Sequence, residues 1–190
     1  NTYFGFFSKQ ALADQIGIRE VAPYQATEQE QARATSFSYP DKAPMPADMM
    51  RMVDEISLYD PEGGPNKLGF IEGKAKVKEE AWFFKAHFYE DPVWPGSLGL
   101  ESFMQLLKVF AWERWKGELE IGRFSFENMA LNHVHEWVYR GQILPVDEEV
   151  TVQAVITEID DSSKTIKADG FLTVDGRIIY QMKDFALRIA

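Results

Sequence analysis

Residues 98–115 read LGLESFMQLLKVFAWERW, and this stretch decides the fold. In a helix built from it, apolar side chains point in almost every direction during the first three turns. A helix that is apolar nearly all round is enclosed by the rest of its protein. Lys116-Gly117-Glu118 follows as a stop signal. The sequence therefore predicts one long helix in the middle of the fold.

A strand pattern precedes this helix. Residues 69–77 alternate between an apolar face that includes Ile71 and Val77 and a charged face that includes Glu72. This period of two is typical of a half-buried strand. Residues 49–56 are apolar enough for a first strand or for a short buried segment.

The C-terminal third reads as a meander of strands. Residues 150–156 and 166–174 alternate in polarity, with a turn over Asp160–Ser163 between them. Asp175-Gly176 is a hairpin signal, after which residues 177–189 return. One enclosed helix with a long antiparallel sheet is an α+β layout. A sheet wrapped around the helix would explain why the helix has no polar face.

Residues 1–43 differ from the rest. We expect them to form an N-terminal extension or linker that lies against a main domain of residues 44–190. Ser8 could cap a short helix that Gly17 ends. Residues 25–34 are rich in Gln, Glu and Ala, and prolines follow them. A plain connector is the simpler interpretation of this segment.

Composition narrows the classes of protein. The 190 residues, 45% hydrophobic and 14% aromatic, can bury a real core. The absence of cysteine excludes disulfides, thiolate catalysis and cysteine-ligated metals. The net charge of −10 repels phosphate backbones, so nucleic acid is not an expected partner. No apolar run approaches the roughly 20 residues that cross a bilayer, and the start lacks the pattern of a signal peptide. We expect a cytoplasmic protein, and the missing initiating Met suggests a domain cut from a longer chain.

The chemistry is concentrated in residues 82–105, WFFKAHFYEDPVWPGSLGLESFMQ. His87 lies among aromatic residues, and two prolines stiffen the loop that follows it. Gly96 would let the backbone approach a ligand closely. The free N–H groups and the positive dipole end at the start of the helix suit a developing oxyanion.

Glu101 is the sharpest anomaly in this segment, because it lies in the first turn or so of an otherwise apolar helix. A carboxylate at that place is commonly only a dipole partner. Its neighbours Leu100 and Phe103 nonetheless predict burial, which favours the protonated form that a general acid requires. His87 taken alone could be a hydrogen-bonded core histidine. Together the two residues favour acid–base chemistry, although spacing alone does not show that they meet.

The segment resembles the bacterial 3-hydroxydecanoyl-ACP dehydratase family and the dehydratase domains of polyunsaturated-fatty-acid synthases. Their shared motif runs as His-Phe, Asp-Pro-Val-x-Pro-Gly, Leu-Gly-Leu, an acid, and a Gln four residues on. The matching residues are His87-Phe88, Asp91–Gly96, Leu98–Leu100, Glu101 and Gln105, with further matches at Gly141–Pro145 and Val174–Tyr180. The likeness covers roughly residues 44–190.

The resemblance implies a hotdog fold, in which an antiparallel sheet wraps around a long central helix. It also implies activity as a homodimer or as a tandem pseudo-dimer. In such families the His and the acid come from opposite protomers and flank a tunnel. No metal and no cofactor are implied, because the substrate is carried on the phosphopantetheine of an acyl carrier protein.

Carried over residue by residue, the resemblance assigns the roles in dehydration of a 3-hydroxyacyl thioester. His87 would take the C2 proton, and Glu101 would protonate the departing C3 hydroxyl. The Gly96 N–H would polarise the thioester carbonyl, where enolate-like charge develops. Val93 would orient His87 through its carbonyl. The other residues expected to contact substrate are Phe88, Trp94, Pro95, Gly99 and Gln105.

The sequence departs from the family pattern at two positions. The decanoyl-type enzymes carry Asp where this chain has Glu101, whereas related broad-range dehydratases carry Glu. A carboxyl one methylene longer can therefore do the work with a different reach. Those enzymes also have Cys where this chain has Ser97, and we expect that change to be neutral. Neither difference decides whether the double bond is also isomerised.

Several other residues have ordinary interpretations. His133 and His135 stand two apart, so a strand would place them on one face, but a metal would need more ligands. We expect them to be surface or interface histidines. Trp112 and Trp115 are expected in the core or at an interface. The run Trp82-Phe83-Phe84 fits an acyl tunnel and a strand in the core equally well.

The acidic total suits a free, acidic acyl carrier protein poorly. A carrier tethered in the same polypeptide would need little surface attraction, because tethering gives millimolar-scale effective concentrations. We therefore expect a module of a fatty-acid or polyketide-like megasynthase. The bases that could still form a docking patch are Lys85, Lys108, Arg114, Lys116 and Arg123.

Two alternatives come from other classes of protein. A hotdog thioesterase would hydrolyse the same thioesters, but such enzymes usually place their carboxylate elsewhere and lack the Asp-Pro-Val-x-Pro-Gly loop. A catalytically silent hotdog that only completes a pseudo-dimer would be expected to lose His87 or Glu101. This chain retains both.

Overall fold

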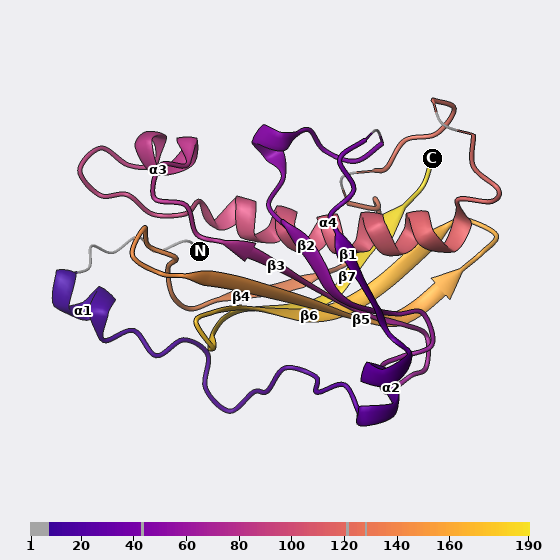
Figure 1. Ribbon diagram of the computed structural model, residues 1–190, viewed down its shortest axis with the longest axis horizontal. Helices are drawn as coiled ribbons and strands as arrows, with labels where there is room; N and C mark the ends of the chain where they lie inside the picture. The colour runs from indigo at the N-terminus through magenta and orange to yellow at the C-terminus, as the bar shows by residue number, and fades with distance from the viewer. Residues whose placement is uncertain (1–7, 43, 121, 128) are drawn as a thin grey trace.

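A computed structural model describes residues 8–42, 44–120, 122–127 and 129–190. Within them, an antiparallel sheet crosses one long helix (Figure 1). The strands are β1 (Thr35–Ser38), β2 (Glu55–Asp60), β3 (Phe70–Lys76), β4 (Glu136–Tyr139), β5 (Glu149–Asp160), β6 (Thr165–Val174) and β7 (Arg177–Arg188), in the sheet order β1-β2-β3-β5-β6-β7-β4. The helices are α1 (Lys9–Ala13), α2 (Glu28–Arg33), the 3₁₀ turn η1 (Asp48–Met50), α3 (Trp82–Ala86) and α4 (Gly96–Trp115).

Helix α4 is the enclosed helix that the sequence predicts. It begins at Gly96 and ends at Trp115, and it packs against β3, β5, β6 and β7. Phe103, Leu106 and Leu107 are completely buried there. Each such side chain stabilises the fold by about 1.5–3 kcal/mol relative to an exposed one. The predicted α+β layout, with a sheet wrapped around an apolar helix, is confirmed.

The predicted strands are also confirmed, with one exception near the start of the domain. β3 lies within residues 69–77, and β5, β6 and β7 form the predicted meander. Residues 49–56 contain the 3₁₀ turn and a short buried stretch, Met52 and Val53, before β2 begins at Glu55. Of the two interpretations of that segment, the buried segment is therefore the correct one for most of its length.

The aromatic run Trp82-Phe83-Phe84 forms helix α3, so of its two interpretations the strand in the core is wrong. A strand would point adjacent rings to opposite faces. In the helix, Phe83 and Phe84 both reach Trp94, with ring centroids 4.5 and 6.2 Å apart. Contact with an aromatic residue ten or so positions away therefore decides the local structure.

The N-terminal segment follows the face of the sheet opposite to α4 (Figure 1). Ser8 caps α1 as predicted, since its Oγ accepts the Ala11 N–H at 3.2 Å, and α1 ends at Ala13, ahead of Gly17. The Ile18 N–H donates to the Ile178 carbonyl of β7 at 2.7 Å. β1 pairs with β2, so four residues of the expected extension belong to the sheet itself. The domain boundary after residue 43 stays a prediction.

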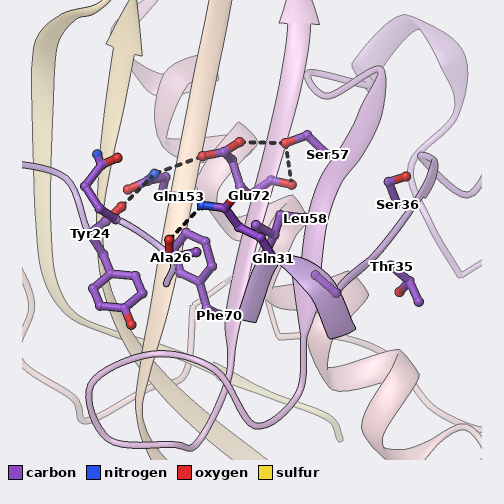
Figure 2. Close-up of a pocket in the computed structure, with 12 residues that line it drawn as sticks. Tyr24, Ala26, Gln31, Thr35, Ser36, Ser57, Leu58, Phe70, Glu72 and Gln153 are labelled. Atoms are coloured by element: carbon purple, nitrogen blue, oxygen red, sulfur yellow. Dashed lines mark hydrogen bonds between the residues drawn. The ribbon is translucent and has the colours of Figure 1, made fainter. Parts of the chain in front are cut away.

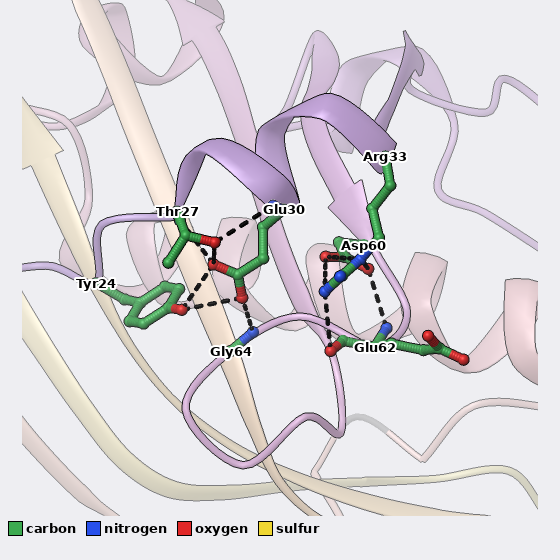
Figure 3. Close-up of polar contacts among 7 residues, drawn as sticks. All are labelled: Tyr24, Thr27, Glu30, Arg33, Asp60, Glu62 and Gly64. Atoms are coloured by element: carbon green, nitrogen blue, oxygen red, sulfur yellow. Dashed lines mark hydrogen bonds and ion pairs between the residues drawn. The ribbon is translucent and has the colours of Figure 1, made fainter.

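Helix α2 is fastened to the β2–β3 loop by a cluster of polar side chains (Figure 3). Glu30 is only 6% exposed. Both of its carboxylate oxygens accept from the Tyr24 hydroxyl at 2.9 Å, and the Gly64 N–H donates to Oε1 at 2.8 Å. Thr27 adds its N–H at 2.6 Å and its hydroxyl at 2.8 Å. Burial alone would raise the pKa of Glu30, but these hydrogen bonds outweigh it and lower that pKa from 4.5 to about 2.

Candidate active site

His87 lies directly after α3, where it caps the helix C-terminus. Its ring Nδ1 is 3.1 Å from the Val93 carbonyl oxygen, and the Val93 N–H donates to the His87 carbonyl at 2.8 Å. Because a carbonyl can only accept, Nδ1 carries the proton in this contact. The lone pair of the neutral ring then sits on Nε2. The half-buried imidazole is thereby oriented as a base, with Val93 beside it as expected.

The loop after His87 is fixed at its aromatic end. Trp94 is buried, and its backbone N–H donates to the Ile143 carbonyl at 2.9 Å. This bond joins the loop to the Gly141–Pro145 motif. The rings of His87 and Phe88 lie 3.8 Å apart between centroids. Phe88 is 55% exposed. One side of the imidazole therefore faces an exposed apolar surface, and the other side is held by the loop backbone.

The start of α4 approaches the sheet very closely. The Tyr180 hydroxyl donates to the Gly96 carbonyl at 3.1 Å. A Cβ atom added at Gly99 would lie 2.3 Å from the Tyr180 ring, so only glycine fits there. Among the described residues, the N–H groups of Gly96 and Ser97 have no acceptor. Such unpaired donors at the positive end of a 20-residue helix can stabilise an oxyanion.

Glu101 lies in the second turn of α4, just beyond the expected first turn or so. Its side chain is 27% exposed, so it is half-buried, not enclosed. Oε1 accepts from the Gln105 amide at 3.0 Å and from the Lys108 ammonium at 2.9 Å. The apolar sequence neighbours predict a surrounding that favours the protonated acid, whereas this ammonium favours the carboxylate. The spacing of positions 101, 105 and 108 places them in one row of a helix, which is a signal that sequence reasoning missed.

Gln105 links Glu101 to the segment that precedes β2. Its side chain is completely buried. The amide nitrogen donates to the Met50 carbonyl at 2.7 Å, and the amide oxygen accepts the Met52 N–H at 2.9 Å. These contacts hold the Gln105 amide in place beside Glu101. They also place Gln105 behind Glu101, and its expected contact with substrate stays a prediction.

Within the described part of one chain, no hydrogen bond joins His87 to Glu101. Each residue has its own set of partners, on the loop for His87 and on α4 for Glu101. The sequence-based site residues therefore fall into two groups. One comprises His87, Phe88, Val93 and Trp94, and the other comprises Glu101 and Gln105, with Pro95, Gly96 and Gly99 at the helix start between them.

Several cavities open on the described part of the chain. One, of about 460 Å³, lies between the N-terminal segment and the sheet face opposite to α4 (Figure 2). On its wall, Glu72 accepts from Ser57 at 2.8 Å and from Gln153 at 2.9 Å. Another, of about 140 Å³, is bordered by Trp82, Phe83 and Trp94 and so adjoins the His87 group. The aromatic run of α3 therefore does line a cavity, beside the loop that holds His87.

The remaining candidates lie apart from the site. His133 and His135 precede β4 and are not on a strand; the His133 Nε2 lies 3.4 Å from Arg188, and His135 packs on Phe185. Trp115 is buried in the core and Trp112 is half-buried, stacked on Phe124. Among the residues that the structure describes, no cluster of three His, Asp or Glu side chains could hold a metal. The described helices also include none with the length and apolarity to span a membrane.

Four of the five bases that could form a docking patch are paired with acids. Lys108 is buried against Glu101. Arg114 pairs with Asp161 at 2.8 Å, and Lys116 pairs with Glu113 at 2.7 Å. Arg123 pairs with Glu120 at 2.9 Å, which leaves Lys85 as the exposed base close to the His87 loop. Neighbouring acids therefore weaken the positive field of the other exposed bases, and a docking role for this patch stays a prediction.

Comparison with known proteins identifies the relatives of this fold. The model of the FabA-like domain matches residues 45–183. One of the polyunsaturated fatty acid synthase subunits of Thraustochytrium sp. is 29% identical over an alignment of 217 residues, which includes all of this chain and 14% of that protein. This chain thus spans a small part of its curated relative. The dehydratase heterocomplex ApeI:P from Xenorhabdus doucetiae matches with a TM-score of 0.51 and 13% identity, over 76% of this chain and 84% of that chain. That likeness shows a shared hotdog fold.

Proposed function

Because this chain belongs to the FabA-like domain family, we propose that it removes water from 3-hydroxyacyl thioesters to give trans-2-enoyl thioesters. The substrate would be carried on an acyl carrier protein, in fatty-acid or polyketide-type synthesis. The observation that carries the proposal is the contact between His87 Nδ1 and the Val93 carbonyl, which leaves Nε2 as a base. The likeness to part of a polyunsaturated fatty acid synthase supports the same pathway class.

The proposed reaction uses the two groups of site residues together. His87 Nε2 takes the C2 proton, and the electrons of that C–H bond move toward the thioester carbonyl. The Gly96 N–H donates to the carbonyl oxygen as its negative charge develops. The C3–O bond then breaks, and the leaving hydroxyl takes a proton from Glu101 to depart as water. A proton passed from the His87 imidazolium back to Glu101 restores both groups.

The site needs a second hotdog copy in this proposal, because no hydrogen bond joins His87 to Glu101 within the described part of one chain. The second copy would be another molecule of this chain in a homodimer, or a tandem hotdog in a longer polypeptide. Strand β4 is one edge of the sheet, and its Trp137 is 37% exposed. An edge strand with free N–H and C=O groups readily pairs with another chain. Pairing at β4 would place the partner beside Tyr139, whose ring lies 3.2 Å from a Cβ built at Gly96.

The proposal is tested by offering the chain 3-hydroxyacyl pantetheine thioesters and following the products by mass. Loss of water with the thioester intact supports it. Release of free pantetheine would indicate a thioesterase, and no reaction in a chain shown to be folded and dimeric would indicate a silent partner. Either of those results contradicts the proposed dehydration.

A further inference from the structure

Lys108 is the most unusual residue of α4. It is 9% exposed, and its neighbours Leu107 and Val109 are completely buried. Taking an ammonium out of water is costly, and an apolar side chain of similar size often stabilises such a position as well or better. A lysine here is therefore not explained by packing. Its contact is specific: Nζ donates to Glu101 Oε1 at 2.9 Å.

The two oxygens of Glu101 have different surroundings. Oε1 accepts from both Gln105 and Lys108, at 3.0 and 2.9 Å. Oε2 has no donor among the residues that the structure describes. Because Gln105 is in turn fixed to the backbone of Met50 and Met52, the carboxyl is held from one side only. The other oxygen is left for a group that arrives from outside the chain.

We infer that Lys108 is a positioning residue that acts through Glu101, and this inference rests on the proposed dehydration. Its ammonium holds Oε1, so that Oε2 presents the proton to the leaving hydroxyl. As Oε2 gives up that proton, negative charge develops on the carboxyl, and Lys108 stabilises it at a distance of one hydrogen bond. Lys108 keeps its own proton throughout, so the balance of the reaction is unchanged. Lys108 thus stabilises the charge that the carboxyl acquires and fixes which oxygen delivers the proton.

The other charged and titratable groups around this pair are few among the described residues. Tyr39 contacts the Gln105 carbonyl through its hydroxyl at 3.4 Å. Burial, and then the charge of Glu101, raise the pKa of Tyr39 far above its ordinary value, so this phenol stays neutral. Arg51 opposes this rise at Tyr39 and pairs with Asp48 at 3.1 Å. Lys108 is therefore the cation that contacts Glu101, and removing it changes the charge balance at the carboxyl directly.

The test compares Lys108→Met, Lys108→Arg and the control Lys116→Met, whose lysine pairs with Glu113 on the solvent side of the same helix. In Lys108→Met we expect kcat for dehydration to fall about 10-fold or more with KM changed less than about 2-fold, as for lost transition-state stabilisation. The fall in activity at high pH should move to higher pH, because the ammonium that stabilises the Glu101 carboxylate is gone. Lys108→Arg should recover most of kcat, and Lys116→Met should match the wild type. A Lys108→Met enzyme with wild-type kcat and an unmoved alkaline limb would overturn the inference.

A second readout does not depend on turnover. In a ¹³C-carboxyl NMR titration, the Glu101 signal is assigned by its loss in Glu101→Gln. We expect its midpoint to move to higher pH in folded Lys108→Met and to stay in place in Lys108→Arg and Lys116→Met. An unmoved midpoint in Lys108→Met overturns the inference, whatever the activity. An inactive wild type with a moved midpoint would instead reject the proposed dehydration and leave the Lys108–Glu101 coupling established.

Discussion

Two carboxylates in this molecule are held in opposite ways. Glu30, in helix α2, has donors on both oxygens, all of them uncharged: the Tyr24 hydroxyl, the Thr27 N–H and hydroxyl, and the Gly64 N–H. Glu101, in helix α4, has both of its donors on Oε1, and one of them is an ammonium. Glu30 is 6% exposed, whereas the Glu101 side chain is 27% exposed.

The difference teaches what each carboxylate can do. Both oxygens of Glu30 already accept hydrogen bonds, and these bonds stabilise the attachment of α2 to the β2–β3 loop (Figure 3). Oε2 of Glu101 accepts no hydrogen bond from the described residues, so this oxygen remains available to a substrate. We therefore expect substitutions at the two positions to separate stability from catalysis.

The largest effect is expected at Glu101. Glu101→Gln removes the proton donor but keeps the shape, so dehydration should fall by about 10²–10⁴-fold while the protein still folds. His87→Ala should lower the rate over the same range, because the base is lost. Steady-state kinetics beside urea unfolding measure both quantities. Glu113→Gln is the matched control on the same helix. A fully active Glu101→Gln enzyme would show that Oε2 delivers no proton.

A smaller effect, on stability alone, is expected at Glu30. Glu30→Gln replaces an acceptor-only group by an amide and leaves buried donors without a charged partner. We expect a loss of about 1–3 kcal/mol in unfolding free energy. The catalytic rate of the folded protein should not change. Glu28→Gln, an exposed acid in the same turn, should stay within about 0.5 kcal/mol of the wild type. Equal stabilities for Glu30→Gln and Glu28→Gln would contradict the role of Glu30 as an anchor.

The smallest effect is the pH dependence of that anchor. The folded-state pKa of Glu30 is lowered to about 2 from its ordinary 4.5. A lowered pKa contributes stability that is present above the ordinary value and is lost as the pH falls toward the folded value. The stability difference between wild type and Glu30→Gln should thus be constant above about pH 5 and shrink between about pH 4.5 and 2. Urea unfolding at a series of pH values measures it, and a difference that grows on acidification would reverse the assigned sign.

What the sequence predicted and what it missed follow the range of the interactions. Helix α4 and the β5–β7 meander were predicted because their periodicities are local and their turn residues are specific. Helix α3 was not, because three adjacent aromatic residues fit a strand as well as a helix until Trp94 is placed against them. The Thr27–Glu30 spacing is a capping-box signal that the sequence carries and that was overlooked. The contact between Glu30 and Gly64 joins distant segments, and no local pattern encodes it.

At the candidate site, the motif predicted His87, Val93, Gly96 and Glu101, and local spacing could have drawn attention to Lys108. The burial of Glu101 was overestimated, because its apolar neighbours in sequence point away from it on the helix. On a helix, the side chains that neighbour a given carboxyl stand three, four and seven positions away in the sequence. The surroundings of a carboxyl in an apolar helix are therefore better predicted from those positions than from the adjacent residues.

Mixing two inactive variants tests the central claim most directly. If His87 of one copy works with Glu101 of another, His87→Ala and Glu101→Gln should each be nearly inactive. After exchange of protomers, half of the dimers would be mixed, and each of these would contain one intact site. The mixture should then regain up to about a quarter of wild-type dehydration. No recovery in a mixture whose exchange is complete by native mass spectrometry would contradict a site shared between two copies.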